Sequence, residues 1–107
     1  MKTILAPIDF SEASVNALSF AAELSKRTSA RLFVINVLQN GESETETKDK
    51  LKAIESDLKK SFSSGLKFES FLAHGDLVST FKKVISSHHP DLIVMGTKGA
   101  SGLKLLS

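Results

Sequence analysis

The chain alternates between short apolar runs and longer segments in which apolar residues recur every three or four positions. Continuous apolar runs are typical of strands buried on both faces of a parallel sheet, whereas the wider spacing is typical of amphipathic helices. The predicted strands are Thr3–Ile8, Ala30–Leu38, Lys67–Ala73 and Leu92–Met95. The third strand is the most polar, so we expect it at an edge of the sheet.

Helical spacing fills the segments between these strands. It predicts a first helix that ends at about Arg27, a second over 51–62 and a third over 77–88. Ser11 is positioned to cap the first helix, with Glu12 in the first turn, where the helix dipole favours an acid. The order β-α-β-α-β-α-β predicts an α/β fold with a doubly wound parallel sheet and right-handed crossovers.

A glycine-rich segment follows the last predicted strand. Gly96, Gly99 and Gly102 recur at a spacing of three, and Leu103–Leu106 predicts the start of a helix. Glycines let the backbone approach an anion closely, and a helix N-terminus behind them favours phosphate. The spacing matches neither the dinucleotide fingerprint nor the Walker loop, so a tight turn remains the alternative. Lys98 either neutralises a phosphate or is simply exposed.

The ends of the strands are the other candidate positions. Ligands of open parallel sheets bind at the carboxyl ends of the strands, where the strand order reverses. The residues expected at those ends are Asp9, Val37-Leu38, His74-Gly75 and 96–102. The Asp9 carboxylate can accept from a ribose hydroxyl, ligate a cation beside phosphates or cap the first helix, and these roles are compatible.

The composition argues against several other classes of function. The chain has 107 residues, no cysteine and a net charge of +2 with interleaved acids and bases. His74, His88 and His89 lack helical metal-ligand spacing, so structural roles are favoured and no metal site is expected. No nucleophile elbow supports a catalytic triad. We expect no nucleic-acid partner and no membrane partner, and the absence of a signal-peptide pattern predicts a cytoplasmic protein.

Three segments of the chain, in this order and spacing, resemble the universal stress protein family. They are Ile-Leu-Ala-Pro-Ile-Asp-Phe-Ser at 4–11, Val-Ile-Asn-Val at 34–37 and Asp-Leu-Ile-Val-Met-Gly-Thr-Lys-Gly at 91–99. The resemblance implies a Rossmann-like, adenine-nucleotide alpha-hydrolase-like fold with strand order 3-2-1-4-5. The expectation is one such domain over 1–107, incomplete at its C-terminus and lacking the fifth strand and the last helix of the family.

The resemblance also implies a binding site for an adenine nucleotide. The nucleotide-binding branch carries Gly, two residues, Gly, nine residues and then Gly-Ser or Gly-Thr; Gly96 and Gly99 match the first half, and only eight residues follow. Asp9 would meet the ribose or the adenine, and the backbone around Val37 would meet the adenine edge. The expected nucleotide-binding residues are Pro7, Asp9, Val37, Met95, Gly96, Thr97, Lys98, Gly99 and Gly102.

The implied function is a stress-response regulatory domain that binds ATP, ADP or AMP, with Mg²⁺ only alongside the nucleotide. We expect no enzyme activity, because no general base or arginine finger is recognisable, although weak ATP hydrolysis stays open for a longer chain. The alternative is a protein-interaction or dimerisation module of the family that binds no nucleotide. A homodimer or swapped oligomer is expected, because strand Leu92–Met95 would be left as an apolar edge.

Overall fold

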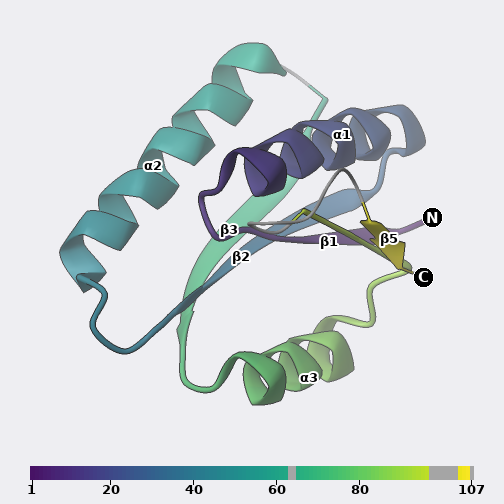
Figure 1. Cartoon of the computed structure of the whole chain (residues 1–107). Coiled ribbons are helices and arrows are strands. Elements are labelled where there is room, and N and C mark those ends of the chain that lie inside the picture. Colours follow the sequence, from purple (N-terminus) through teal and green to yellow (C-terminus); the bar gives the residue numbers. More distant parts are fainter. Residues whose placement is uncertain (63–64, 97–103, 107) are drawn as a thin grey trace.

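A computed structural model of the chain describes residues 1–62, 65–96 and 104–106 (Figure 1). The elements in chain order are β1 (Thr3–Pro7), α1 (Glu12–Thr28), β2 (Arg31–Leu38), α2 (Glu44–Ser61), β3 (Lys67–His74), α3 (Leu77–His88), β4 (Leu92–Met95) and β5 (Lys104–Leu106). The predicted order of strands and helices is confirmed as far as β4. Among the described residues no helix combines the length and the apolar character that crossing a bilayer requires.

The sheet has the order β3-β2-β1-β4-β5, and its first four strands are parallel. β1 is central, because Ile4 pairs with Leu32 of β2 on one side and with Leu92 of β4 on the other. β3 is at the edge, as its polar sequence predicted. The strand order reverses between β1 and β4, so the topology creates a crevice at the carboxyl ends of these two strands.

The parallel part of the sheet has the four predicted strands, but the prediction that the last residues begin a helix is wrong for Lys104–Leu106. These residues form the short strand β5, which is antiparallel to β4 and pairs Val94 with Leu105. So short a segment cannot offset the unfavourable nucleation of a helix. The edge of β4 offers backbone groups for pairing, and the connection from Met95 to Lys104 is shorter than a parallel crossover needs, so the strand is antiparallel.

Each helix begins at a polar residue that caps it. Ser11 and Ser43 accept from the backbone N–H groups of Ser14 and Glu46, both at 3.2 Å. The Asp76 carboxylate accepts from Ser79 N–H at 3.0 Å and caps α3. The Ser43 cap explains why α2 begins well before the apolar residues that predicted it. These caps satisfy N–H groups that have no partner within the helix.

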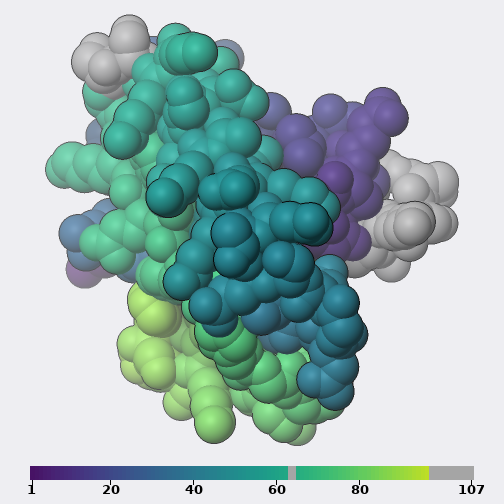
Figure 2. All heavy atoms as spheres, turned by 90° about the vertical axis from the view of Figure 1, so that its left-hand side faces the viewer, coloured from purple at the N-terminus to yellow at the C-terminus, as the bar shows by residue number. Residues whose placement is uncertain are grey.

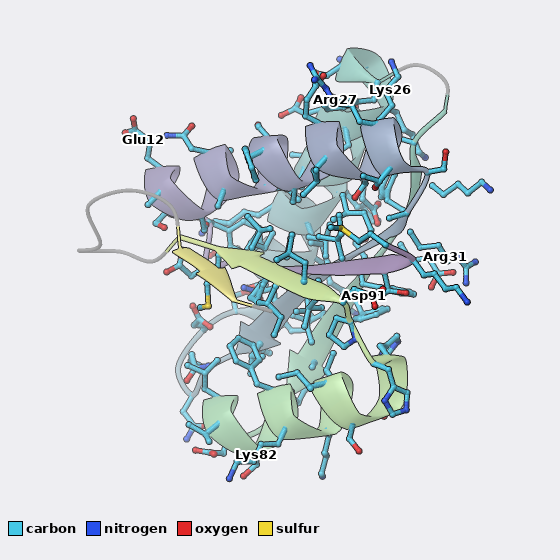
Figure 3. All side chains as sticks on the ribbon, turned by 90° about the vertical axis from the view of Figure 1, so that its right-hand side faces the viewer. Glu12, Lys26, Arg27, Arg31, Lys82 and Asp91 are labelled. Carbon is cyan, nitrogen blue, oxygen red and sulfur yellow. The ribbon has the colours of Figure 1, made fainter. Side chains whose placement is uncertain are left out.

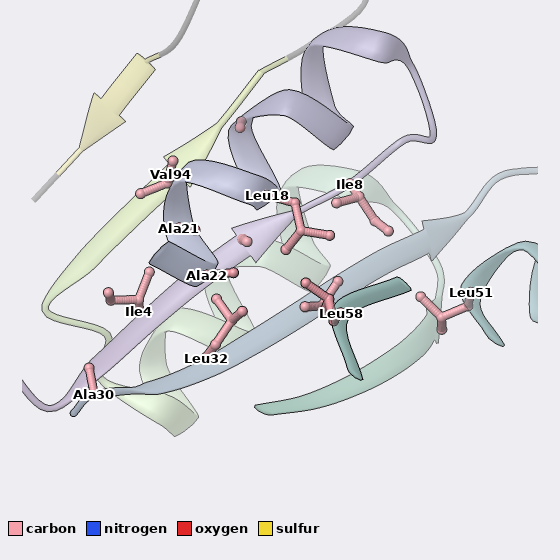
Figure 4. Packing of buried hydrophobic residues seen from close by; sticks show 13 residues of the cluster. Ile4, Ile8, Leu18, Ala21, Ala22, Ala30, Leu32, Leu51, Leu58 and Val94 are labelled. Carbon is pink, nitrogen blue, oxygen red and sulfur yellow. The ribbon is translucent and has the colours of Figure 1, made fainter. Parts of the chain in front are cut away.

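α1 and α2 cover one face of the sheet, and α3 lies on the other (Figure 1). Figure 2 shows the side of the molecule on which α2 lies, with α3 below it. The main core fills the space between α1, α2 and the sheet (Figure 4). The small side chains of Ala17, Ala21 and Ala22 let α1 approach the sheet closely, and all three are buried.

The α3 face of the sheet is covered more thinly. Leu5, Phe33 and Ile35 are buried there, but no residue of α3 itself is buried. The side chains of Val78 and Ile85 on α3 remain 60% and 40% exposed. α3 therefore rests on the sheet through partly buried contacts only.

Candidate functional site

A pocket of about 180 Å³ opens at the carboxyl ends of β1, β2 and β4, in the crevice that the topology creates. Its lining comes from these three strand ends, from the turn after β2 and from the start of α3. The lining residues are Pro7, Ile8, Asp9, Ile35, Asn36, Val37, Gln39, Glu42, Leu77, Phe81, Met95 and Gly96. Residues that are far apart in the sequence thus meet in one cavity.

Five of the residues predicted from the sequence lie together in this lining, namely Pro7, Asp9, Val37, Met95 and Gly96. Their role in binding stays a prediction. The other four, Thr97, Lys98, Gly99 and Gly102, lie outside the described residues. The pocket therefore contains the predicted site residues that lie at the ends of the strands.

Asp9 both lines the pocket and begins the turn into α1. Its Oδ1 accepts from Ser11 N–H at 2.9 Å, and its own N–H donates to Ser14 Oγ at 3.3 Å. Ser14 is fully buried and also donates through Oγ to the Ser11 carbonyl at 3.0 Å. The expected capping and ligand-facing roles of Asp9 are thus compatible, because its side chain is exposed at the pocket while it caps the turn.

Phe10, which follows Asp9, has a backbone φ of +63°. A bulky residue in the left-handed region costs roughly 1–3 kcal/mol and persists only where its surroundings hold it. The ring of Phe10 is half-buried against the main core, and Lys50 Nζ lies 5.7 Å from its centroid. Contacts of Phe10 with the core and with Lys50 therefore help to hold the turn that carries Asp9.

The backbone of Val37 extends past the last residue of β1. Ile8 N–H donates to the Ile35 carbonyl at 2.8 Å, so the backbone groups of Ile35 point toward β1. Alternate residues of a strand point the same way, so the Val37 groups also face that side, where β1 has ended. The Val37 carbonyl accepts from Gln39 Nε2 at 3.2 Å.

Asn36 was not predicted as a site residue, although a polar residue within an apolar strand was a signal for it. It is 5% exposed, and its Nδ2 donates to the Ile8 carbonyl at 2.8 Å. Its Oδ1 has no hydrogen-bond partner among the described residues. Asn36 therefore adds a side-chain link between the end of β2 and the end of β1 beside the pocket.

Leu77 and Phe81 were also missed, and the sequence carries no signal for them. They belong to α3, whose apolar spacing is explained by packing alone. Only the position of α3 across the sheet brings them to the pocket. Gln39 and Glu42 were missed as well. They line the pocket from the turn after β2, where the sequence predicted only the end of a strand.

Gly96 has a packing role within the fold that the sequence did not suggest. A Cβ at Gly96 would lie 2.4 Å from the carbonyl oxygen of Ala13 and 2.8 Å from its carbonyl carbon. The backbone at Gly96 therefore approaches the first turn of α1 closely, and its role toward a ligand stays a prediction. This contact positions the end of β4 beside the end of β1.

The charges at the pocket are both negative. Asp9 and Glu42 are the ionisable residues of the described lining. His74, a candidate at the end of β3, lies outside that lining and binds Glu44 through Nε2 at 2.6 Å. That hydrogen bond, followed by that of Lys48, lowers the pKa of Glu44. The described residues include no group of three or more acids or histidines that could hold a metal ion.

These features define a Rossmann-like α/β domain with a pocket at its switch point. The sequence model of the universal stress protein family matches residues 1–107, and the chain belongs to this family. No curated protein matches the chain significantly.

Solved structures of other proteins have a similar fold. A universal stress protein family member from Burkholderia pseudomallei has a TM-score of 0.67 and 23% identity, over 90% of this chain and 81% of the other. A universal stress protein in complex with cAMP has a TM-score of 0.71 and 17% identity, over 88% and 70%. The hypothetical protein MJ0577 has a TM-score of 0.65 and 26% identity, over 88% and 73%.

Proposed function

We propose that this chain is a stress-response regulatory domain that binds an adenine nucleotide at the carboxyl ends of β1 and β4. The observation that carries the proposal is the pocket, in which Asp9, Val37 and Gly96 meet from three strand ends. The cAMP complex of a structurally similar universal stress protein supports a nucleotide as the ligand.

The described lining suits the nucleoside part of such a ligand. Leu77, Phe81 and Met95 offer apolar surface to a base, and Asp9 offers an acceptor to ribose hydroxyls. A volume of about 180 Å³ is below the roughly 300–1,000 Å³ usual for complete ligand sites, so it fits a base and sugar better than a whole nucleotide.

Phosphate groups need other partners, because Asp9 and Glu42 would repel them. Lys98 and the glycines beside it are the expected partners by sequence. Mg²⁺ would bind only with the phosphates, since two acids supply too few ligands for a metal-only site. We expect binding without rapid turnover, because the described lining contains no lysine or arginine to stabilise the charge of a transferring phosphoryl group.

Calorimetry and thermal shift with ATP, ADP, AMP, cAMP and adenosine test this proposal. We expect adenosine and the nucleotides to bind, and Asp9→Ala to weaken all of them about tenfold, since a hydrogen bond to a charged group contributes roughly 1.5–3 kcal/mol. Asp49→Ala is the matched control, because Asp49 is exposed on α2 and away from the pocket. Absence of heat and of any thermal shift with all five compounds would contradict the proposal.

A second candidate function, a protein-interaction module, is favoured by a different observation. Val78 and Ile85 expose apolar surface on α3, beside the thinly covered face of the sheet. Exposed apolar patches mark association surfaces in many proteins. A second copy of the chain is the expected partner.

A further inference from the structure

The turn after β2 forms one rim of the pocket and is closed by three hydrogen bonds. Glu42 N–H donates to the Gln39 carbonyl at 3.2 Å, with Gly41 at a φ of +90° in the third position of the turn. The Glu42 carboxylate accepts from Gln39 N–H at 2.6 Å. The third bond is the one from Gln39 Nε2 to the Val37 carbonyl. The turn thus holds the side chain of Gln39 over the end of β2.

The Val37 carbonyl is a backbone acceptor at this edge of the pocket. Beyond the end of β1 no strand residue is left to pair with it, and the donor that it has is the Gln39 carboxamide. A carboxamide N–H₂ and the 6-amino group of a purine are the same kind of donor, a planar N–H₂ on an sp² carbon. The carbonyl oxygen has two lone pairs, but Gln39 and Val37 both line the pocket, so a purine amino group that approaches Val37 from the pocket meets the carboxamide already bound there.

We propose that Gln39 is a built-in competitor for the purine amino group: its carboxamide occupies the Val37 carbonyl in the free protein and leaves when a 6-aminopurine binds. The inference rests on the proposed function and adds to it the residue that sets affinity and base preference. Gln39 is exposed, so its side chain can turn into solvent without disturbing the core. Glu42 still holds the backbone of the turn when it does so.

The competition affects some ligands and not others. A base with an amino group at position 6 replaces one hydrogen bond by another and gains little net free energy from this contact. A purine without that group leaves Gln39 in place. Removing the Gln39 donor therefore benefits only the aminopurine, and this difference distinguishes competition from a general effect on the pocket.

A cycle of two ligands and two proteins tests the proposal. Adenosine and purine riboside, which lacks the 6-amino group, are titrated into the wild-type chain and into Gln39→Met. Methionine keeps the length of the side chain and cannot donate a hydrogen bond. We expect Gln39→Met to bind adenosine about three- to tenfold more tightly, and purine riboside within about twofold of wild type.

Two controls accompany the cycle. Asn40→Ala changes the neighbouring residue of the turn, which lies outside the pocket lining, and should leave both affinities unchanged. In the wild-type chain, the side-chain amide resonances of Gln39 should shift and exchange faster with solvent when adenosine saturates the site. Purine riboside should leave these resonances in place.

The outcomes separate this inference from the proposed function. If adenosine binds both proteins with equal affinity, or binds Gln39→Met more weakly, the competitor role is wrong and the proposed function stands. If adenosine binds neither protein at millimolar concentration, both are overturned. Equal tightening of adenosine and purine riboside would also overturn the competitor role, since it would mean that Gln39 simply obstructs the pocket.

Discussion

At the scale of single residues, Gly96 has the most restrictive surroundings among the lining residues. The atoms nearest to an added Cβ are backbone atoms of Ala13, so no side-chain rotation relieves the overlap. Replacing Ala13 would not relieve it either, because its carbonyl is the obstacle. Space for a methyl group requires β4 and α1 to move apart.

We therefore predict that Gly96→Ala lowers the free energy of unfolding by about 1–3 kcal/mol, as overpacking of tight sites does. Chemical denaturation of the whole chain measures it. Gly41→Ala is a useful comparison, because Gly41 has a φ of +90° and no atom within 4 Å of an added Cβ, so its cost is that of backbone conformation alone. A Gly96→Ala variant as stable as wild type would show that β4 and α1 can separate freely.

Sequence reasoning identified Asp9 because a carboxylate directly after a buried strand is conspicuous, and Val37 because it was expected at the carboxyl end of the second strand, which the family resemblance then supported. It did not predict the contact of Gly96 with α1, since a glycine in a sequence does not reveal which neighbour lies close to it. Leu77 and Phe81 could not be predicted as pocket residues. Their place depends on how α3 crosses the sheet, which the helical spacing alone does not determine.

At the scale of elements, a single aspartate joins the beginnings of two strands. Asp91 directly precedes β4, and its Oδ2 accepts from Lys2 N–H at 2.9 Å and Thr3 N–H at 3.0 Å (Figure 3). Its own N–H donates to the Thr3 carbonyl at 2.9 Å. These hydrogen bonds favour the charged carboxylate and lower the pKa of Asp91 below its ordinary value of 3.8.

This lowered pKa predicts how stability depends on pH. Because the folded pKa lies below the unfolded one, the contribution of Asp91 is complete above the unfolded pKa and is lost as the pH falls through the folded value. We expect Asp91→Asn to reduce the slope of unfolding free energy against pH below about pH 4. Asp57→Asn on α2 is the control. An unchanged slope in Asp91→Asn would mean that the strands are joined without this carboxylate.

The elements themselves were largely predictable, because apolar spacing separates strands from helices clearly in this chain. α3 and β4 have the bounds that the sequence predicted. The failures have physical causes. α2 begins early because Ser43 caps a polar turn, and Lys104–Leu106 form a strand because the edge of β4 was available for pairing.

At the scale of the whole molecule, the two faces of the sheet differ in how well they are covered. α1 and α2 bury residues on one face, whereas α3 buries none of its own on the other. Val78 and Ile85 are seven residues apart on α3, so they lie on the same side of the helix. Both side chains are exposed to solvent there. This flank is the expected contact between two copies of the chain.

We predict that the chain sediments as a dimer at micromolar concentration, rather than as a monomer of 11.6 kDa. The double substitution Val78→Lys and Ile85→Lys should yield the monomer, because it places charge on the apolar flank. Both side chains are exposed in the single chain, so the substitutions should not destabilise the fold of the monomer itself. Any fall in melting temperature should therefore come from the loss of the dimer alone. A wild-type chain that is monomeric at this concentration would contradict the prediction.

The central position of β1 has a consequence for the order in which the chain folds. β2 follows β1 after one helix, but β4 comes almost at the other end of the described sequence, and the Asp91 hydrogen bonds span 88 and 89 residues. Closing so long a loop is slow, because its entropic cost comes before any contact compensates for it. During synthesis β1 is made before the other strands, and the longest delay is the one until β4, its second neighbour in the sheet, has been made. Until β4 arrives, the strand that will be most deeply enclosed in the native sheet is an open edge that another chain can pair with.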